Sequence, residues 1–361
     1  MKIGIDAKWY FNGHPSGKVV VENIVNHIVK EDPTIDFYIF LSKKDRHLKF
    51  PIEQPNIHLV YIPNLLNAVT NIFIMPFYTS KYNLDVCIYQ NYAPLFGAKK
   101  IVNYVHDALF IDFPEFFTLK ERIYFYPMKY LSKRADHVIT ISYSEKERML
   151  KHGFCKDKNI TVVYHGLGLA NNKQSLNKVN IFKKYDLPNK FILYLGRLNV
   201  RKNIQNLIKA LPLVSEEISL VIVGKSDHKT SNLDQLINHL KVNDRVFKVG
   251  YIDFEDIEFF YKNALIFCFP SFAEGFGLPP LEAMYYGTPV VVSNKTSLPE
   301  VCGDSALYID PNDPSEIANQ INLLLENNIL RNNLIEKGKQ RSSEFSWKRA
   351  SNEILNILKT I

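Results

Sequence analysis

The sequence predicts an α/β protein built from two doubly wound domains that face each other across a central cleft. Short runs rich in β-branched residues alternate with longer amphipathic runs, which is the pattern of a parallel sheet covered by helices on both faces. The alternation starts again after a polar stretch at residues 171–184. The length of 361 residues suits two domains of ordinary size.

Each half of the chain supplies its own series of predicted elements. The predicted strands of the first half are residues 2–6, 37–41, 58–62, 85–89, 101–105, 137–141 and 160–163. Those of the second half are residues 191–195, 220–223, 246–249, 266–269, 290–292 and 306–309. Helical spacing is found at residues 19–30, 203–211, 233–240, 256–262 and 279–286. We place an N-terminal domain at 1–170, a linker at 171–186, a C-terminal domain at 187–344, and a helix at about 345–361 that packs back on the first domain.

Composition and charge narrow the class of protein. The four cysteines form no CxxC pair, so we expect buried reduced thiols and a cytoplasmic location. The uncharged stretch 54–80 is interrupted by prolines, which favours a buried strand and a core helix, with membrane-surface contact as the alternative. Residues 1–175 carry 22 Lys and Arg against 16 Asp and Glu, and residues 176–361 carry 22 against 21. The basic first half suits an anionic surface or substrate, or reflects ordinary surface variation.

Two glycine-containing turns in the second half carry the predicted chemistry. Gly196 and Arg197 follow a predicted strand, and Arg201 and Lys202 stand where a helix begins. Guanidinium, ammonium and helix N–H groups all attract a diphosphate, although a solvated charged turn would have the same residues.

The second turn follows the strand at 266–269 and has the sequence PSFAEGFGLPPLEAM, residues 270–284. Gly275 and Gly277 let the backbone approach a ligand, and the N–H groups of Phe276, Gly277 and Leu278 precede a helix with an early proline. Glu274 and Glu282 are eight residues apart, and carboxylates pair well with sugar and ribose hydroxyls. The alternative is a helix N-terminus whose dipole favours acidic residues.

The segment EGFGLPPLEAM resembles the E-x7-E signature of retaining family 4 glycosyltransferases, which have the two-domain GT-B fold of Rossmann-like domains. The segment GR…RKN resembles the donor-diphosphate site of that family, and the chain is most similar to bacterial O-antigen-type mannosyltransferases. The resemblance implies that Arg197 and Lys202 bind the donor diphosphate, Glu274 the donor sugar and Glu282 the ribose. It also implies that Gly196, Gly224, Tyr251 and Ile252 frame the nucleotide, and that the amides of Gly275, Phe276, Gly277 and Leu278 surround sugar and phosphate.

The first half offers fewer candidates. By the same resemblance, His106 in the Val105-His106-Asp107 run lies on the acceptor side of the donor sugar, with a satisfied turn histidine as the alternative. Gly17, in the loop 12–18, matches the first glycine loop of the family, although His14, Pro15 and Ser16 replace its usual closely spaced glycines. His165 is a weaker candidate to face the cleft.

We expect no metal and no other cofactor, because the chain has no D-x-D tripeptide and no His or Cys pair at metal-ligand spacing. The preferred function is a retaining hexosyltransferase that uses a GDP- or UDP-sugar, with GDP-mannose as the first choice. Its acceptor would be a glycan or lipid-linked glycan of a bacterial surface polysaccharide such as the lipopolysaccharide O-antigen. The alternatives are a nucleotide-sugar epimerase or hydrolase, and a non-catalytic binding subunit of the same fold.

The segment 116–134, FFTLKERIYFYPMKYLSKR, combines aromatic and basic residues as a headgroup-binding surface would. We expect either reversible contact with the inner face of the cytoplasmic membrane, or a core helix kinked near Pro127 with solvated lysines. No nucleic-acid partner is expected.

Overall fold

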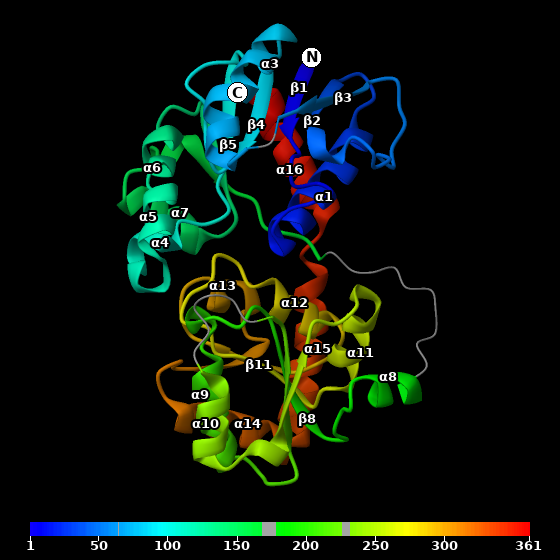
Figure 1. Cartoon of the computed structure of the whole chain (residues 1–361), viewed down its shortest axis with the longest axis vertical. Coiled ribbons are helices and arrows are strands. Elements are labelled where there is room, and N and C mark those ends of the chain that lie inside the picture. Colours follow the sequence, from blue (N-terminus) through cyan, green and yellow to red (C-terminus); the bar gives the residue numbers. More distant parts are fainter. Residues whose placement is uncertain (64, 168–177, 226–231) are drawn as a thin grey trace. The chain divides into compact units, whose positions relative to one another are not determined.

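The computed structural model describes residues 1–63, 65–167, 178–225 and 232–361, with the backbone alone at 178–180. It divides into two compact units, the first made of Met1–Gly168 with Phe345–Ile361 and the second of Leu169–Glu344 (Figure 1). Each unit has its own parallel sheet and its own buried apolar residues.

The sheet of the first unit has the strand order β3-β2-β1-β4-β5-β6-β7. Its strands are β1 (Lys2–Asp6), β2 (Asp36–Ser42), β3 (Ile57–Ile62), β4 (Val86–Gln90), β5 (Lys100–Tyr104), β6 (His137–Thr140) and β7 (Ile160–Val162). The strand order reverses between β1 and β4, so the carboxyl ends of these two strands form the topological switch point, where doubly wound sheets bind ligands.

The helices of the first unit include one from the far end of the chain. They are α1 (Pro15–Glu31), α2 (Asn67–Val69), α3 (Met75–Lys81), α4 (Leu109–Asp112), α5 (Leu119–Phe125), α6 (Pro127–Ser132), α7 (Tyr143–Lys151) and α16 (Trp347–Thr360). Helix α16 (red) lies beside α1 (blue) in Figure 1, and its buried Ile354, Leu355 and Leu358 are the apolar residues whose spacing predicts it.

The sheet of the second unit has the order β10-β9-β8-β11-β12-β13. Its strands are β8 (Phe191–Leu195), β9 (Ser219–Val223), β10 (Val246–Gly250), β11 (Ile266–Phe269), β12 (Val290–Ser293) and β13 (Ala306–Ile309). Apart from the edge strand β10, which contains the exposed Lys248, these strands are largely apolar and mostly buried, as expected for a parallel sheet covered on both faces. The switch point lies between β8 and β11, which are the strands that precede the two predicted turns.

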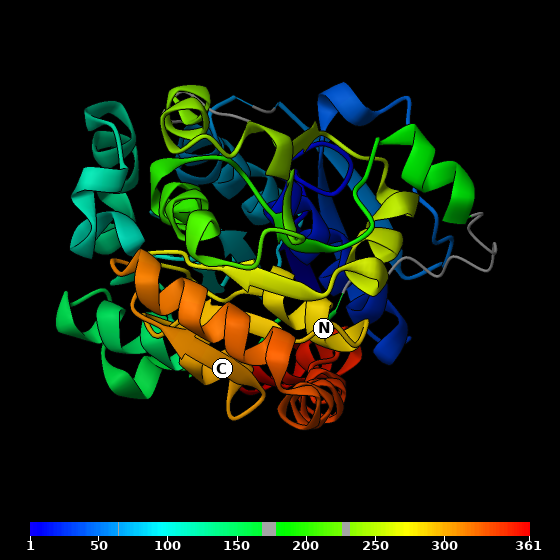
Figure 2. The same cartoon turned by 90° about the horizontal axis from the view of Figure 1, so that it is seen from below.

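Helices cover this second sheet on both sides. They are α8 (Lys178–Lys184), α9 (Ile204–Ala210), α10 (Leu233–Leu240), α11 (Ile257–Asn263), α12 (Leu278–Tyr285), α13 (Leu298–Cys302), α14 (Pro314–Glu326) and α15 (Asn328–Ser343). Figure 1 shows α9, α10 and α14 on one side of β8 and β11, and α11, α12 and α15 on the other. Figure 2 shows α14 (orange) against the yellow and orange strands of the sheet.

All thirteen predicted strands are present, with ends that agree within a residue. Three local predictions need correction. Residues 178–184, predicted as linker, form helix α8, and residues 171–177 lie outside the described part of the chain. Helix α1 begins at Pro15 rather than near Val19, because proline is well suited to the first turn of a helix. The loop predicted at residues 12–18 therefore ends at His14.

The third correction concerns the stretch 54–80. Its helical part, from α2 to α3, packs Met75 into the core but leaves Phe73 58% and Phe77 66% exposed, so it is not a core helix throughout. The four cysteines are free thiols, as expected, with three buried and Cys155 half-buried. Within the described residues, no helix is long and apolar enough to cross a bilayer.

Candidate functional site

The turn after β8 places basic residues at the carboxyl edge of the second sheet. Gly196 follows the strand, and the exposed Arg197 is fixed through its carbonyl oxygen, which accepts a hydrogen bond of 3.0 Å from the Tyr194 hydroxyl. A short 3₁₀ turn, η5 (Val200–Lys202), then brings Arg201 and Lys202 back to the same edge. Asn203 ends that turn in the left-handed conformation with φ of 57°, and its side-chain amide donates to the carbonyls of Pro270 and Pro311.

Glu274, on the turn after β11, is the acidic partner of these cations. The ammonium of Lys202 lies 2.7 and 2.8 Å from its two carboxylate oxygens, and the Arg201 guanidinium lies 3.3 Å from Oε2. Ser271 donates a further hydrogen bond to Oε1, and the backbone N–H of Glu274 donates to Thr296 Oγ1 at 2.9 Å. The predicted diphosphate and sugar residues, Lys202 and Glu274, therefore lie in direct contact.

Burial and neighbouring charges set the protonation of this cluster. Glu274 is 6% exposed. Burial acts to raise its pKa, but the charges of Lys202 and Arg201 and the hydrogen bonds outweigh it, so the pKa is lowered and the group is a carboxylate. For Lys202, burial and the charges of Arg201 and Arg197 outweigh the attraction of Glu274 and lower the pKa to about 8. Lys202 and Arg201 thus contact one carboxylate, and the charge of Arg197 acts on Lys202.

Glycines hold the turns around this cluster close together. Gly224, after β9, has φ of 147°, and a Cβ at this position would lie 1.8 Å from the carbonyl oxygen of Gly196. Gly277 has φ of 120° and is the N-cap of α12, where a Cβ would lie 2.8 Å from Leu298. Gly275 and Phe276 are buried in the same turn, and Leu278 is the first residue of α12. The hydroxyl of Ser297 fixes the turn by donating to the carbonyls of Glu274 and Phe276.

The predicted ribose and base residues lie on neighbouring elements. Glu282 is half-buried one turn into α12, where it accepts a hydrogen bond of 2.8 Å from the Tyr261 hydroxyl of α11. Burial raises the pKa of Glu282 to about 7. Tyr251, after β10, is 69% exposed with the Lys225 ammonium 4.9 Å from its ring centre, whereas Ile252 is buried. Tyr251 therefore offers an aromatic surface beside the Gly224 turn.

The first unit brings both Gly17 and His106 close to one side chain, Trp9. The ring centres of Trp9 and His106 are 5.5 Å apart, and a Cβ on Gly17 would lie 2.9 Å from the Trp9 ring. Gly17 lies in the first turn of α1, so it allows the helix to pack against Trp9. His165 is buried against Trp347 of the same unit, with ring centres 5.4 Å apart, which favours a core position for it.

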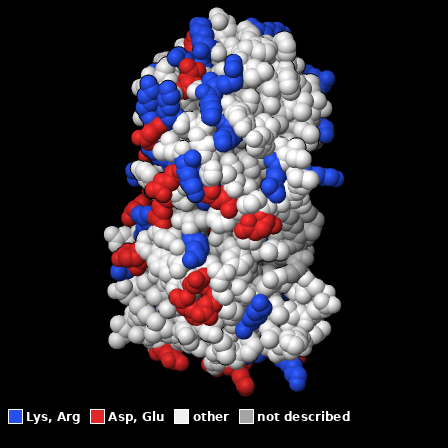
Figure 3. Space-filling model, turned by 90° about the vertical axis from the view of Figure 1, so that its left-hand side faces the viewer, with Lys and Arg blue, Asp and Glu red and all other residues white. Residues whose placement is uncertain are grey.

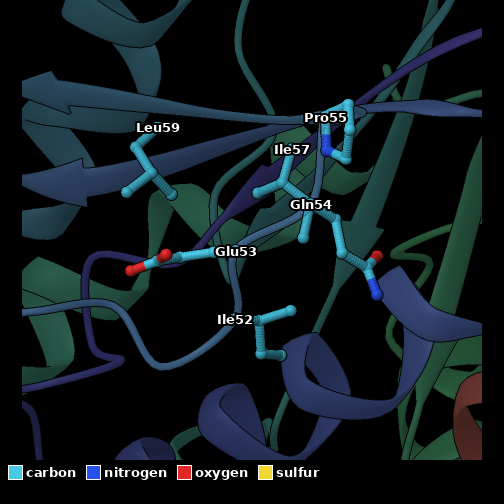
Figure 4. A pocket seen from close by; sticks show the side chains of 6 residues that line it. All are labelled: Ile52, Glu53, Gln54, Pro55, Ile57 and Leu59. Atoms are coloured by element: carbon cyan, nitrogen blue, oxygen red, sulfur yellow. The ribbon is translucent and has the colours of Figure 1, made fainter.

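The described residues contain no group of three or more His, Cys, Asp or Glu side chains placed to hold a metal ion. The first unit also has a hollow beside β3, which is shown in Figure 4. It is lined by Ile52, Glu53, Gln54, Pro55, Ile57 and Leu59 and contains none of the predicted site residues.

Sequence reasoning missed the residues that hold the predicted ones in place. In the second unit these are Ser271, Thr296, Ser297 and Tyr261. Arg201 also contacts Glu274, although the family resemblance assigned only Arg197 and Lys202 to the diphosphate. In the first unit they are Trp9 and Gln90. The position of Ser271 three residues before Glu274 was visible in the sequence, whereas the other contacts join distant segments.

Comparisons with known proteins agree with this architecture. The family "Glycosyltransferase Family 4" matches residues 17–170, and the family "Glycosyl transferases group 1" matches residues 177–341. O-antigen chain mannosyltransferase B of Escherichia coli is 31% identical over 272 residues, which are 73% of this chain and 71% of that protein. O-antigen chain mannosyltransferase RfbU of Salmonella typhimurium is 33% identical over 230 residues, 63% of this chain and 61% of that protein.

Among solved structures, HepE of Anabaena in complex with UDP and glucose has a TM-score of 0.75 at 21% identity and covers the full length of both chains. WaaG, a glycosyltransferase involved in lipopolysaccharide biosynthesis, has a TM-score of 0.71 at 14% identity, also over both full lengths. These likenesses concern the fold. Together with the matches in sequence, they show that the chain belongs to the group 1 and family 4 glycosyltransferases and has their GT-B fold of two Rossmann-like domains.

Proposed function

We propose that this glycosyltransferase moves mannose from GDP-mannose to a growing bacterial surface polysaccharide, with retention of the anomeric configuration and without a metal ion. The observation that carries the proposal is the excess of positive charge around the Lys202–Glu274 pair. Arg197, Arg201 and Lys202 together outnumber this carboxylate, and the cluster lies at the switch point of the second sheet. A diphosphate supplies the negative charge that such a cluster lacks.

In this proposal the cations stabilise the leaving group. The bond between the anomeric carbon and the diphosphate oxygen breaks, and a bond to the acceptor hydroxyl oxygen forms on the same face of the sugar. The departing phosphate takes the acceptor proton, so that GDP leaves with that proton. Arg197 and Lys202 stabilise the charge that develops on the diphosphate, which is the role that preorganised cations have in related phosphate chemistry.

The remaining residues orient the donor. Glu274 already accepts hydrogen bonds from Lys202 and Ser271, which hold its carboxylate in place for the hydroxyls of the donor sugar. Glu282, held by Tyr261, binds the ribose diol, and Tyr251 is placed to stack on the base. Mannose is chosen as the sugar because the relatives from Escherichia coli and Salmonella typhimurium are named mannosyltransferases of the O-antigen chain.

We propose further that the acceptor is lipid-linked and that the enzyme meets it in the cytoplasm, at the inner face of the cytoplasmic membrane. The supporting surface is on α5 and α6, which meet at Pro127. Its exposed members are Leu119, Lys120, Arg122, Ile123, Tyr126, Tyr130, Lys133 and Arg134. Figure 3 shows blue Lys and Arg side chains over the upper part of this face, where the first unit lies, with red Asp and Glu side chains as well as uncharged residues among them.

The aromatic residues of this segment divide into two groups. Phe116, Phe117, Tyr124 and Phe125 are half-buried, and the last three of these pack against the apolar core. Tyr126 and Tyr130 are exposed, with their hydroxyl oxygens 2.9 Å apart, and Lys129 and Lys133 lie near the Tyr130 ring. The exposed group mixes apolar side chains with basic head groups, as surfaces that bind anionic headgroups do.

A transfer assay tests the proposed reaction. The protein is incubated in EDTA with a synthetic lipid-linked acceptor and either GDP-mannose or UDP-glucose, and the product linkage is read by NMR. We expect an α-mannoside from the α-linked donor GDP-mannose. A β-linked product would contradict retention, and activity that returns only with magnesium would contradict the metal-free reaction. Free mannose without transfer to any acceptor would indicate a hydrolase instead.

A further inference from the structure

The hydrogen bonds around His106 determine which of its ring nitrogens carries the proton. Gln90, the last residue of β4, is 2% exposed and lies at the switch point of the first sheet. Its side-chain Oε1 lies 2.8 Å from Nε2 of His106. Its side-chain nitrogen donates to the backbone carbonyl of Asp6, at the end of β1, over 3.3 Å.

These two contacts allow only one arrangement of protons. The carbonyl oxygen of Asp6 can only accept, so the NH₂ group of Gln90 must face it, and Oε1 must face the histidine. Because Oε1 also can only accept, Nε2 of His106 must carry the proton. Burial lowers the pKa of His106 to about 4, outweighing the charge of Asp6, so the ring is neutral near pH 7. A neutral ring with a proton on Nε2 has a bare Nδ1.

Each polar group of Gln90, in its backbone and in its side chain, makes a hydrogen bond. Its backbone N–H donates to Asp6 Oδ2 over 3.2 Å, and its carbonyl oxygen accepts from the side-chain amides of Asn67 and Asn71, each over 3.0 Å. The Asp6 carboxylate is in turn paired with Lys8, and both side chains are 1% exposed. This buried network holds the side-chain amide of Gln90 in one orientation, because its oxygen and its nitrogen would each lose a hydrogen-bond partner if the amide were flipped.

Burial, and not the neighbouring charge, keeps the ring neutral. Asp6 is the acidic group whose charge favours a proton on His106, and its carboxylate is paired with Lys8. His165 also interacts with His106 electrostatically, and its own pKa is lowered by burial. The His106 ring also lies close to the rings of Trp9 and Tyr104, at 5.5 and 5.0 Å between ring centres.

We propose that Gln90 is a positioning residue that fixes His106 in the Nε2–H tautomer, so that His106 acts on the donor sugar as a hydrogen-bond acceptor through Nδ1. The placement of His106 at the donor sugar is what the family resemblance implies, and this inference therefore rests on the proposed function. Within the described residues, the ring's one hydrogen bond is to Gln90, which leaves Nδ1 of this half-buried side chain for a ligand. Because the unprotonated Nδ1 can only accept a hydrogen bond, it needs a sugar hydroxyl that donates one. The tautomer therefore favours a donor sugar with a free hydroxyl next to Nδ1.

Nitrogen NMR tests the tautomer directly. The full-length protein is labelled with ¹⁵N-histidine, and His106 is assigned by the signals that disappear in His106→Asn. At pH 7 the long-range proton–nitrogen correlations should show a protonated Nε2 and a bare Nδ1. Gln90→Leu should give a mixture of tautomers, and Gln54→Leu, which changes an exposed glutamine of the same unit, should leave the wild-type pattern unchanged. A proton on Nδ1 in the wild type, or an unchanged spectrum in Gln90→Leu, would overturn the inference.

Kinetics separate this inference from the proposed function. If Nδ1 accepts from the sugar, Gln90→Leu should lower the transfer rate about tenfold through the loss of one oriented hydrogen bond, while the affinity for GDP alone stays unchanged. A rate equal to that of the wild type would show that the tautomer has no role in transfer and would overturn the second half of the proposal. Failure of the wild type to transfer any sugar would instead contradict the proposed function, and the tautomer would still be read from the spectrum.

Discussion

At the scale of single residues, the ammonium of Lys202 has the most informative environment in the second unit. It is buried beside Glu274, with Arg201 and Arg197 as the neighbouring cations. Because its pKa is lowered to about 8, Lys202 carries its proton below that pH and loses it above. A diphosphate needs the charged form, so binding should weaken as the pH rises through 8.

We therefore expect the affinity for GDP to be about tenfold lower at pH 9 than at pH 7, as a group with a pKa near 8 requires. Calorimetric titration across this range measures the change. Lys202→Arg is the matched control, because a guanidinium stays charged throughout and should give an affinity that does not depend on pH. The same slope in wild type and Lys202→Arg would exclude Lys202 as the titrating group.

Glu282 offers a second test at this scale. Its carboxylate is expected to accept from the ribose hydroxyls, so Glu282→Ala should weaken GDP binding by about 1.5–3 kcal/mol, the cost of losing a hydrogen bond to a charged group. The matched experiment uses 2′-deoxy-GDP, which should bind the wild type more weakly and lose less in Glu282→Ala. Equal losses for GDP and 2′-deoxy-GDP would show that Glu282 does not contact the ribose 2′-hydroxyl.

Sequence patterns point to residues that are expected to contact a ligand, but they do not point to the residues that support them. Arg197, Lys202, Glu274 and Glu282 lie in contiguous strings whose spacing has a chemical reason. Gln90 supports His106 through a contact that joins β4 to the loop after β5, and no local pattern encodes such a pairing. Supporting contacts of this kind depend on strand order, which sequence periodicity does not specify.

At the scale of elements, the turns after β8 and β9 depend on a close approach of their backbones. We expect Gly224→Ala to destabilise the second unit by about 1–3 kcal/mol, because the added Cβ meets the Gly196 carbonyl and the backbone has positive φ. Gly250→Ala is the matched control, since its φ of 77° carries similar strain but nothing lies within 4 Å of the added Cβ. Thermal unfolding should show a larger loss for Gly224→Ala, and an equal loss in both variants would contradict the steric argument.

Helices α5 and α6 carry the proposed membrane surface. Changing Lys120, Arg122, Lys129 and Lys133 to Ser should reduce co-sedimentation with anionic liposomes, because each basic residue near such a surface contributes about 1 kcal/mol. The wild type should bind less at high salt and less to neutral vesicles. The same change at Lys43, Lys44, Arg46 and Lys49, elsewhere on the first unit, alters the net charge equally and should have a smaller effect. Equal losses from both variants, or equal binding to neutral and anionic vesicles, would exclude α5 and α6 as a specific contact.

Strands were easier to predict than helix ends for a physical reason. Most strands are short, largely apolar runs bounded by polar residues, so their limits can be read directly from the sequence. The start of α1 depends instead on Pro15, whose fixed φ favours a first helical turn, and the periodicity at Val19 shows only where burial begins. For α2 to α3, apolar composition indicated burial, yet Phe73 and Phe77 are exposed because composition does not show which face meets the core.

At the scale of the whole molecule, each unit has its own apolar core, but the first unit is made of two stretches that are far apart in the sequence. The chain returns from the second unit to the first at Phe345, and α16 buries Trp347 and Leu358 there. The ammonium of Lys359 pairs with Asp32 at the end of α1, 2.6 Å away. The predicted donor residues other than Gly17 belong to the second unit, whereas Gly17 and His106 belong to the first. Nucleotide recognition can therefore be measured as a property of the second unit.

The most direct test of the central claim compares nucleoside diphosphates with monophosphates. GDP, GMP, UDP and UMP are titrated calorimetrically into the wild type and into Lys202→Met. If the cluster of Arg197, Arg201, Lys202 and Glu274 is a diphosphate site, one of the two diphosphates should bind at least tenfold more tightly than its monophosphate, as removal of a charge-assisted contact requires. That preference should disappear in Lys202→Met. Equal affinity for diphosphate and monophosphate in the wild type, or a preference that survives in Lys202→Met, would contradict the assignment.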